Sequence, residues 1–388
     1  MKDNFTFYNP TKIYFGKNSI KNLKQELEGY GKNILLAYGG GSIKRNGIYD
    51  EVIDILKACN KNIFEFSGIM PNPTLDKLLE GKRLCEENQI DLILAIGGGS
   101  VIDCAKGVSA SAYIENPWEK FWLNNEECTH SIPVGTILTM VGTGSEANGG
   151  SVITNEETKK KKGHVFGANV FPKFSILDPT YTYTVSRYQM CSGIFDILSH
   201  LMEQYFSGDD DNVSDYLLEG LMRSVINSTK DALKNQESYE ARSNIMWAAT
   251  LALNTLVGKG KDQDWEVHSI EHQISAYTDC SHGMGLSAIS PNYYRHIYKY
   301  GLGKFYRYAV NVFNVNPAGK SVDEVALEGI KCLEKFIKES EMVTNLKELG
   351  CTKEMLIKIA VSSDIETTSY KIMTADEIYE ILLESYEG

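Results

Sequence analysis

Hydrophobic and polar residues follow different patterns in the two halves of the chain. Up to about residue 180, short aliphatic or β-branched runs end in turns and alternate with amphipathic segments. The runs expected to form buried strands are 32–41, 62–68, 91–100 and 131–138. Strands that alternate with helices indicate a parallel sheet covered on both faces, so the first half is predicted to be an α/β domain.

The second half has a helical pattern instead. Beyond about residue 185, long segments place apolar residues at i, i+3, i+4 and i+7, which is the spacing of an amphipathic helix. The stretch 177–186 contains a proline and shows no helical period, which marks it as the joint. We therefore expect an α/β domain over residues 1–184 and an all-helical domain over residues 185–388, packed around a cleft.

Composition and charge exclude several classes of protein. The chain has 388 residues, of which 43% are hydrophobic, and a formal net charge of -12. Such an acidic chain lacks the basic face that nucleic-acid binding needs, and no apolar run reaches the roughly 18 residues of a membrane span. The first residues contain no signal-peptide core, and the eight cysteines are scattered, which is typical of reduced thiols. We expect a cytoplasmic protein that binds neither nucleic acid nor membrane.

Three glycine-rich loops in the first half are candidates for cofactor binding. Residues 39–42 and 97–100 both read GGGS after a predicted strand, and residues 139–146 read TMVGTGSE. Glycine at such a turn lets a phosphate approach the backbone and leaves helix N-terminal amides available to bind it. One loop of this kind is as readily a tight turn, but three together favour a dinucleotide site. None matches GxGxxG, so the domain departs from the conventional Rossmann pattern.

The first loop bears on the choice of cofactor. Folds that bind NAD usually carry a carboxylate after the second strand, where it accepts a hydrogen bond from the ribose 2′-hydroxyl. Residues 38–45 have no carboxylate and two cations, Lys44 and Arg45. This combination favours the 2′-phosphate of NADPH. The alternative is that both cations are simply solvated.

A cluster of metal-ligand residues stands out in the helical half. Asp196 and His200 are spaced i, i+4, as are His268 and His272, and His282 follows ten residues later. One carboxylate with several imidazoles suits Zn²⁺ or Fe²⁺ better than Mg²⁺ or Ca²⁺. A single Asp/His pair is usually a surface hydrogen bond, but two pairs and a third histidine in a histidine-poor chain favour a metal site. Five candidates compete for about four positions, and spacing alone does not say which one stands apart.

These motifs resemble a known family. The DxxxH and HxxxH pairs and the His-Gly at 282–283, with GGGS and GTGSE upstream, are similar to the iron-containing (group III) alcohol dehydrogenases. The resemblance is strongest to their NADPH-dependent butanol dehydrogenase and aldehyde reductase branch. It implies a homodimer of the dehydroquinate synthase-like fold, with an α/β dinucleotide-binding domain and a helical metal-binding domain.

The resemblance also implies roles for individual residues. Asp196, His200, His268 and His282 would bind one Fe²⁺ or Zn²⁺ ion, and His272 would stand near the substrate. The implied cofactor positions are Gly40, Gly41, Ser42, Gly97, Gly98, Gly99, Ser100, Asp103, Thr139, Thr143, Asn148 and Lys162. Residues 141–142 and 279–281 vary from the family pattern, which leaves the substrate preference open.

The expected reaction interconverts an aldehyde and a primary alcohol. A bound ion would polarise the carbonyl, NADPH (or NADH) would exchange the hydride, and His272 or a water that it orients would supply the proton. Two rivals use the same architecture: a dehydroquinate-synthase-like lyase and a glycerol-type dehydrogenase that uses NAD. The lyase would need a basic pocket, for which only the lysines in 159–162 are available. A non-catalytic sensor would bind NADPH and metal without oxidising the cofactor when aldehyde is added.

Overall fold

The computed structural model of the protein describes residues 4–208 and 211–388, which form two compact units. One unit is Tyr8–Val185. The other is Ser186–Gly388, together with the segment that ends at Phe7. No described helix combines the length and the apolar character that crossing a membrane would require.

The first unit is built on a six-stranded sheet in which every pair of neighbouring strands is parallel, in the order β1-β8-β5-β4-β2-β3. The strands are β1 (Lys12–Phe15), β2 (Asn33–Tyr38), β3 (Asn62–Phe66), β4 (Leu92–Gly97), β5 (Val134–Leu138) and β8 (Phe174–Leu177). A separate antiparallel hairpin joins β6 (Gly150–Asn155) and β7 (Lys160–Val165). The predicted parallel sheet is confirmed, and each of the four expected strands is present.

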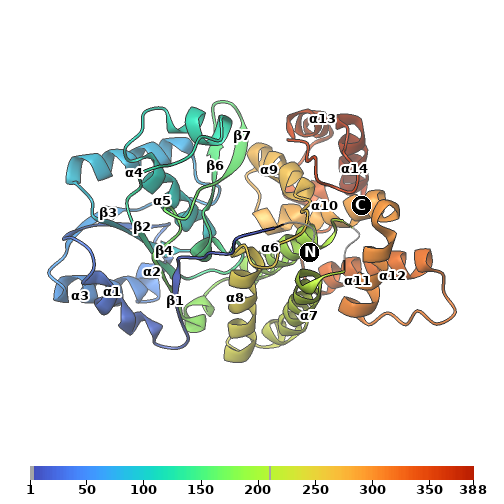
Figure 1. The fold of residues 1–388 in the computed structure, drawn as a ribbon, viewed down its shortest axis with the longest axis horizontal. Helices are drawn as coiled ribbons and strands as arrows, with labels where there is room; N and C mark the ends of the chain where they lie inside the picture. The colour runs from blue at the N-terminus through green and yellow to red at the C-terminus, as the bar shows by residue number, and fades with distance from the viewer. Residues whose placement is uncertain (1–3, 209–210) are drawn as a thin grey trace. The chain divides into compact units, whose positions relative to one another are not determined.

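Helices cover both faces of this sheet (Figure 1). They are α1 (Leu23–Leu27), α2 (Ser42–Arg45), α3 (Ile48–Ala58), α4 (Leu75–Asn88) and α5 (Gly99–Ser111). Alternate residues of a strand point to opposite faces. Leu36 and Leu94 therefore share a hydrophobic core with Val52 and Leu56 of α3. The face that α5 covers is so enclosed that every α5 residue from Val101 onward is buried.

All the regular structure described in the second unit is helical, which confirms the predicted all-helical half. Its helices are α6 (Arg187–Tyr205), α7 (Val213–Lys234), α8 (Tyr239–Leu253), α9 (Glu266–Thr278), α10 (His282–Ile297), α11 (Leu302–Phe313), α12 (Val322–Glu339), α13 (Lys353–Ser362) and α14 (Ala375–Glu387). Helix α6 is central: it packs against α7, α8, α9 and α10, and its residues from Met190 to Tyr205 are all buried. The side chain of Ser186 caps this helix by accepting a hydrogen bond from the amide of Gln189.

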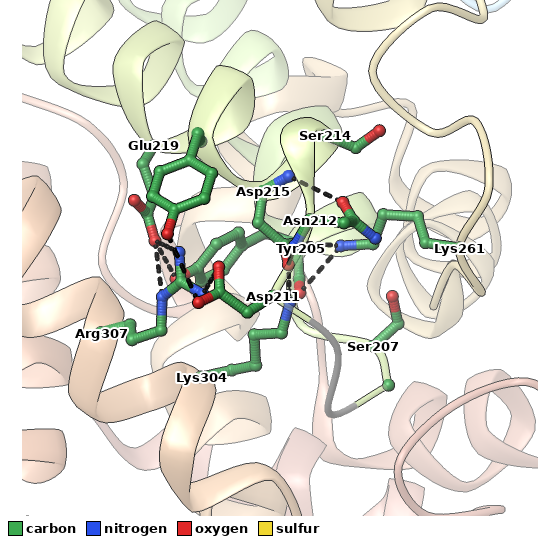
Figure 2. A network of polar contacts seen from close by, with 12 residues as sticks. Tyr205, Ser207, Asp211, Asn212, Ser214, Asp215, Glu219, Lys261, Lys304 and Arg307 are labelled. Carbon is green, nitrogen blue, oxygen red and sulfur yellow. Dashed lines mark hydrogen bonds and ion pairs between the residues drawn. The ribbon is translucent and has the colours of Figure 1, made fainter. Parts of the chain in front are cut away.

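A buried ion network fixes the loop that leads into α9. Figure 2 shows Asp215, in the first turn of α7, between the ammonium groups of Lys261 (2.6 Å) and Lys304. Lys261 belongs to the loop before α9, and Ser214 also binds this loop by donating to the carbonyl of Lys259 (2.9 Å). Breaking a buried ion pair costs about 3–5 kcal/mol. The path of the loop, and with it the start of α9, is therefore closely specified.

Candidate functional site

Helix α6 presents a carboxylate and an imidazole on one face. Asp196 and His200 are spaced i, i+4, so their side chains lie one turn apart on the same side of the helix. His200 Nε2 lies 3.4 Å from Asp196 Oδ1, and both side chains are about 5% exposed. The spacing seen in the sequence thus produces a direct contact in a buried place.

Helices α9 and α10 bring two further imidazoles to the same oxygen. His268 Nε2 lies 3.7 Å and His282 Nε2 3.6 Å from Asp196 Oδ1. Ligand atoms of Asp196, His268 and His282 all lie within 4.8 Å of one another. His200 contacts the same carboxylate oxygen, but it does not belong to this set of three. Ligands about 2.1 Å from a tetrahedral ion are about 3.4 Å apart. The observed separations are therefore close to those of residues that share one ion.

The hydrogen-bonding state of these atoms tests whether a metal fits. Among the described residues, Asp196 Oδ1 and His268 Nε2 are buried and have no hydrogen-bond partner. A buried polar atom without a partner costs free energy, and nearly all such atoms in proteins are satisfied. Both atoms are among those that converge, so a cation bound between them would satisfy both. The donor set consequently fits a Zn²⁺ or Fe²⁺ ion placed between them.

Two buried glutamates orient the imidazoles. Glu203 pairs with His268 Nδ1 and also accepts hydrogen bonds from the His268 amide (3.0 Å) and from Ser199 Oγ (2.7 Å). Glu271 pairs with His282 Nδ1 in the same way. A carboxylate at Nδ1 fixes the tautomer and turns Nε2 toward the metal position.

Sequence reasoning missed both glutamates, although a signal was present. Each lies three residues after a candidate histidine, Glu203 after His200 and Glu271 after His268. That spacing keeps the carboxylate on the face of the helix that carries the ligands. A glutamate on the buried face of an amphipathic helix requires a partner, and the neighbouring histidines were the partners available.

The electrostatics of the group favour a cation. Burial acts to raise the pKa of Asp196, but the nearby imidazoles of His200, His282 and His268 outweigh it and hold that pKa well below its usual range. Burial lowers the pKa of His200 to about 3, although Asp196 opposes the shift. With Glu203 and Glu271, three buried carboxylates surround the imidazoles, and a divalent ion would offset their charge.

His272 stands beside this group but belongs to a second one. It lies one turn after His268 on α9, and its ring centroid is 6.2 Å from that of His268 and 5.6 Å from that of His282. Its ligand atom is within 4.8 Å of those of Glu271 and His282. His272 is half-buried, whereas Asp196 and His268 are buried, so it lies closer to the solvent.

In the first unit, two of the predicted cofactor loops lie against each other. Residues 97–100 span the end of β4 and the start of α5, and the Thr139 amide donates to the Gly97 carbonyl (2.9 Å). A Cβ atom at Gly99 would overlap the side chain of Thr143. Glycine is therefore required at this position for the loop of 139–146 to pack against the start of α5.

Asp103 and Asn148 fix the conformation of the loop of residues 139–146. Asp103 is buried and accepts hydrogen bonds from Ser145 Oγ and from the Val152 amide (3.0 Å). Asn148 accepts from Lys106 Nζ (3.0 Å), and burial lowers the pKa of this lysine to about 8 although Asp103 opposes the shift. Both side chains are thus engaged within the protein, and their contacts set the conformation of the loop.

The remaining predicted cofactor positions are more open. A Cβ atom at Gly40 or Gly41 would meet no atom within 4 Å, and Ser42 is exposed at the start of α2. Lys162 is half-buried in β7, where it pairs with Ile153 of β6.

The two cations of the first loop have different surroundings. Lys44 Nζ is 3.5 Å from a carboxylate oxygen of Glu65 on β3 and lies over the rings of Tyr38 (5.0 Å) and Tyr49 (4.4 Å). Arg45 is exposed. Glu65 was missed in the sequence because it lies on the next strand in the sheet, outside residues 38–45.

Both units match models of one protein family. The model described as "Iron-containing alcohol dehydrogenase" matches residues 10–179, and "Fe-containing alcohol dehydrogenase family, C-terminal" matches residues 190–386. NADH-dependent butanol dehydrogenase A of Clostridium acetobutylicum is 41% identical, over 98% of this chain and 99% of that protein. The NADPH-dependent aldehyde reductase YqhD of Escherichia coli is 36% identical, over 90% of this chain and 89% of that protein. The crystal structure of NADH-dependent butanol dehydrogenase A from Thermotoga maritima is 34% identical and superimposes with a TM-score of 0.94, covering 99% of both chains.

Proposed function

Because this chain belongs to the iron-containing alcohol dehydrogenase family, we propose that it interconverts an aldehyde and a primary alcohol with NAD(P)(H) at a metal centre. The observation that carries the proposal is the convergence of three imidazole nitrogens on Asp196 Oδ1. The names of the relatives, butanol dehydrogenase and aldehyde reductase, support this substrate class. We assign the activity to a homodimer, the state that the family resemblance implies, and place it in the cytoplasm because the scattered cysteines are typical of reduced thiols.

In this proposal Asp196, His200, His268 and His282 hold one Fe²⁺ or Zn²⁺ ion. When bound, such an ion supplies Lewis-acid polarisation of the carbonyl oxygen. Glu203 and Glu271 keep Nδ1 of His268 and His282 engaged, which leaves each Nε2 directed at Asp196. The burial of Asp196 and His200 excludes water from this side of the centre.

The activity has a direct test. Metal-free protein reconstituted anaerobically with Fe²⁺ or Zn²⁺ is expected to oxidise NADPH when linear aldehydes from acetaldehyde to hexanal are added. Metal-free protein is expected to be inactive. Binding of NADPH and metal without any aldehyde-dependent oxidation of the cofactor would identify a sensor and overturn the proposal.

His272 is proposed to hold the proton that the product alcohol receives. It lies beside His282 on the more exposed side of the cluster and belongs to the group around Glu271. An imidazole is suited to this task because its ordinary pKa is near neutrality. A half-buried position lets it exchange its proton with solvent.

His272→Ala should lower turnover by about a hundredfold, which is the lower end of the rate loss expected when a general acid is removed. The metal content should stay at the wild-type level. Metal analysis by mass spectrometry and the rate of NADPH oxidation with butanal measure the two quantities. Loss of the metal would show that His272 is a ligand, and unchanged turnover would exclude its role as proton donor.

We also propose that NADPH is the preferred cofactor. Residues 38–45 contain no carboxylate, and Ser42 and Arg45 are exposed, so we base the expected contact with a 2′-phosphate on charge alone. Lys44 is less suited to this contact because Glu65 and two tyrosine rings already hold it. The relatives described above carry both cofactors in their names, so the preference has to be measured on this chain.

Arg45→Ala should raise the KM for NADPH about tenfold and leave the KM for NADH unchanged, because one charge-assisted hydrogen bond to the 2′-phosphate is lost. Steady-state kinetics with both cofactors measure the effect. Arg83→Ala on α4 is the matched control, since Arg83 is also exposed and should affect neither KM. An equal change for NADPH and NADH in Arg45→Ala would contradict the assignment.

A further inference from the structure

Helices α9 and α10 carry a second group of metal-ligand side chains. Ligand atoms of Glu271, His272 and His282 lie within 4.8 Å of one another. Glu271 is buried, whereas His272 and His282 are half-buried. This second group therefore lies nearer to the solvent than Asp196 and His268. We call Asp196, His200, His268 and His282 the inner group. An ion from solution could reach the second group while the inner group holds its own ion.

The two nitrogens of His282 face different groups. Its Nε2 is 3.6 Å from Asp196 Oδ1, and its Nδ1 pairs with Glu271 Oε2. A neutral imidazole can bind a metal through either nitrogen, and it can bind through both once its N–H proton is lost. An ion beside Glu271 would thus bind His282 through Nδ1, because Nε2 faces Asp196.

A thiol adjoins the second group. Asp279 ends α9 in the left-handed conformation (φ 52°), and the chain turns back so that Cys280 Sγ lies 3.9 Å from Glu271 Oε1. The same sulfur is 3.6 Å from Ser275 Oγ. A carboxylate, two imidazoles and a thiol are four donors of the kind that Zn²⁺ prefers. The inner group has no sulfur donor.

We propose that Glu271, His272 and His282 bind a second divalent ion of the zinc class, with Cys280 as the fourth donor, and that this ion inhibits the enzyme. The ion replaces the proton between His282 Nδ1 and Glu271, and Cys280 binds as the thiolate, so both protons are released to solvent. Ligand atoms around a tetrahedral ion are about 3.4 Å apart, so the side chains must close in modestly from their present separations. Softer ions such as Zn²⁺ and Co²⁺ should bind, whereas Mg²⁺ should not.

Inhibition follows because the second ion engages His272. The ion occupies the nitrogen at which His272 would take up a proton, so the imidazolium that supplies the proton to the product alcohol no longer forms. This inhibitory consequence rests on the proposed function, whereas the binding of a second ion does not.

The test begins with wild-type protein that holds one equivalent of Zn²⁺ per chain. Titration with further Zn²⁺, followed by calorimetry and by metal analysis after desalting, should reveal a second equivalent, and turnover should fall with the same midpoint. His272→Ala should keep the first equivalent and lose the second. His130→Ala removes an exposed histidine of the other unit and should bind both equivalents.

Cys280→Ser separates the second site from the first. The first equivalent should bind as in the wild type, and the second equivalent should bind about tenfold more weakly. With Co²⁺ as the second ion, the wild type should show a thiolate-to-cobalt absorption band that Cys280→Ser lacks, because only the second site contains sulfur.

Three results would overturn the second site: a wild type that binds only one equivalent, a second equivalent that survives in His272→Ala, or a bound Co²⁺ without thiolate absorption. Failure of the proposed function looks different. In that case the first equivalent itself would be missing, or turnover would be absent before any excess metal is added.

Discussion

His268→Ala should yield protein that contains no catalytic metal and shows no measurable aldehyde reduction. The substitution removes one of the three nitrogens that converge on Asp196 Oδ1, and it leaves the buried carboxylate of Glu203 without its imidazole partner. Breaking such a buried pair costs about 3–5 kcal/mol, so the free energy of unfolding should also fall. Metal analysis, turnover with butanal and thermal unfolding measure the three effects.

Asp196→Ala should give the same metal-free protein, because the oxygen that all three imidazoles approach is lost. His296→Ala is the control, since His296 is a half-buried histidine of the same unit that pairs with Glu377 and lies outside both groups of ligand atoms. It should retain metal and turnover. A His268→Ala or Asp196→Ala variant that kept both metal and activity would refute the assigned ligand set.

Gly283→Ala should weaken metal binding by at least about tenfold and lower the free energy of unfolding by about 1–3 kcal/mol. A Cβ atom at this position would overlap the backbone carbonyl of Ser192 on α6. Backbone atoms of a packed helix cannot move aside cheaply, so α10 would have to shift. The shift would carry His282, the neighbouring residue, away from Asp196.

The matched control is Gly220→Ala in the middle of α7, where a Cβ atom would meet nothing within 4 Å. Alanine is favoured over glycine in a helix interior by about 0.5–1 kcal/mol, so this variant should be slightly stabilised and bind metal normally. Thermal unfolding and metal titration of the two variants measure the difference. Equal gains in stability for both would show that the α6–α10 contact does not position His282.

The sequence was informative wherever the determining interactions are local. The 3.6-residue period identified the helical half, and the i, i+4 spacing put Asp196 and His200 on one face of α6 because helix geometry depends only on neighbouring residues. The GGGS loops were found for the same reason, since a glycine requirement at a strand-to-helix turn is set by the turn itself.

Contacts between distant segments could not be predicted in this way. Nothing in the spacing of Glu203 and His268, which are 65 residues apart, indicates that they pair; the packing of α6 against α9 decides it. The surroundings of Lys44 are another case. Its partner Glu65 reaches it because β2 and β3 are neighbours in the sheet, which depends on strand order.

The sequence by itself therefore determined the α/β and helical halves, the family, and a set of five metal-ligand candidates. The family resemblance had already set His272 apart, but only the tertiary structure showed that Asp196 and Glu271 belong to two groups of ligand atoms that share His282. The physical reason is that a side chain's direction follows from its own helix, whereas the point at which several side chains meet is fixed by how those helices pack.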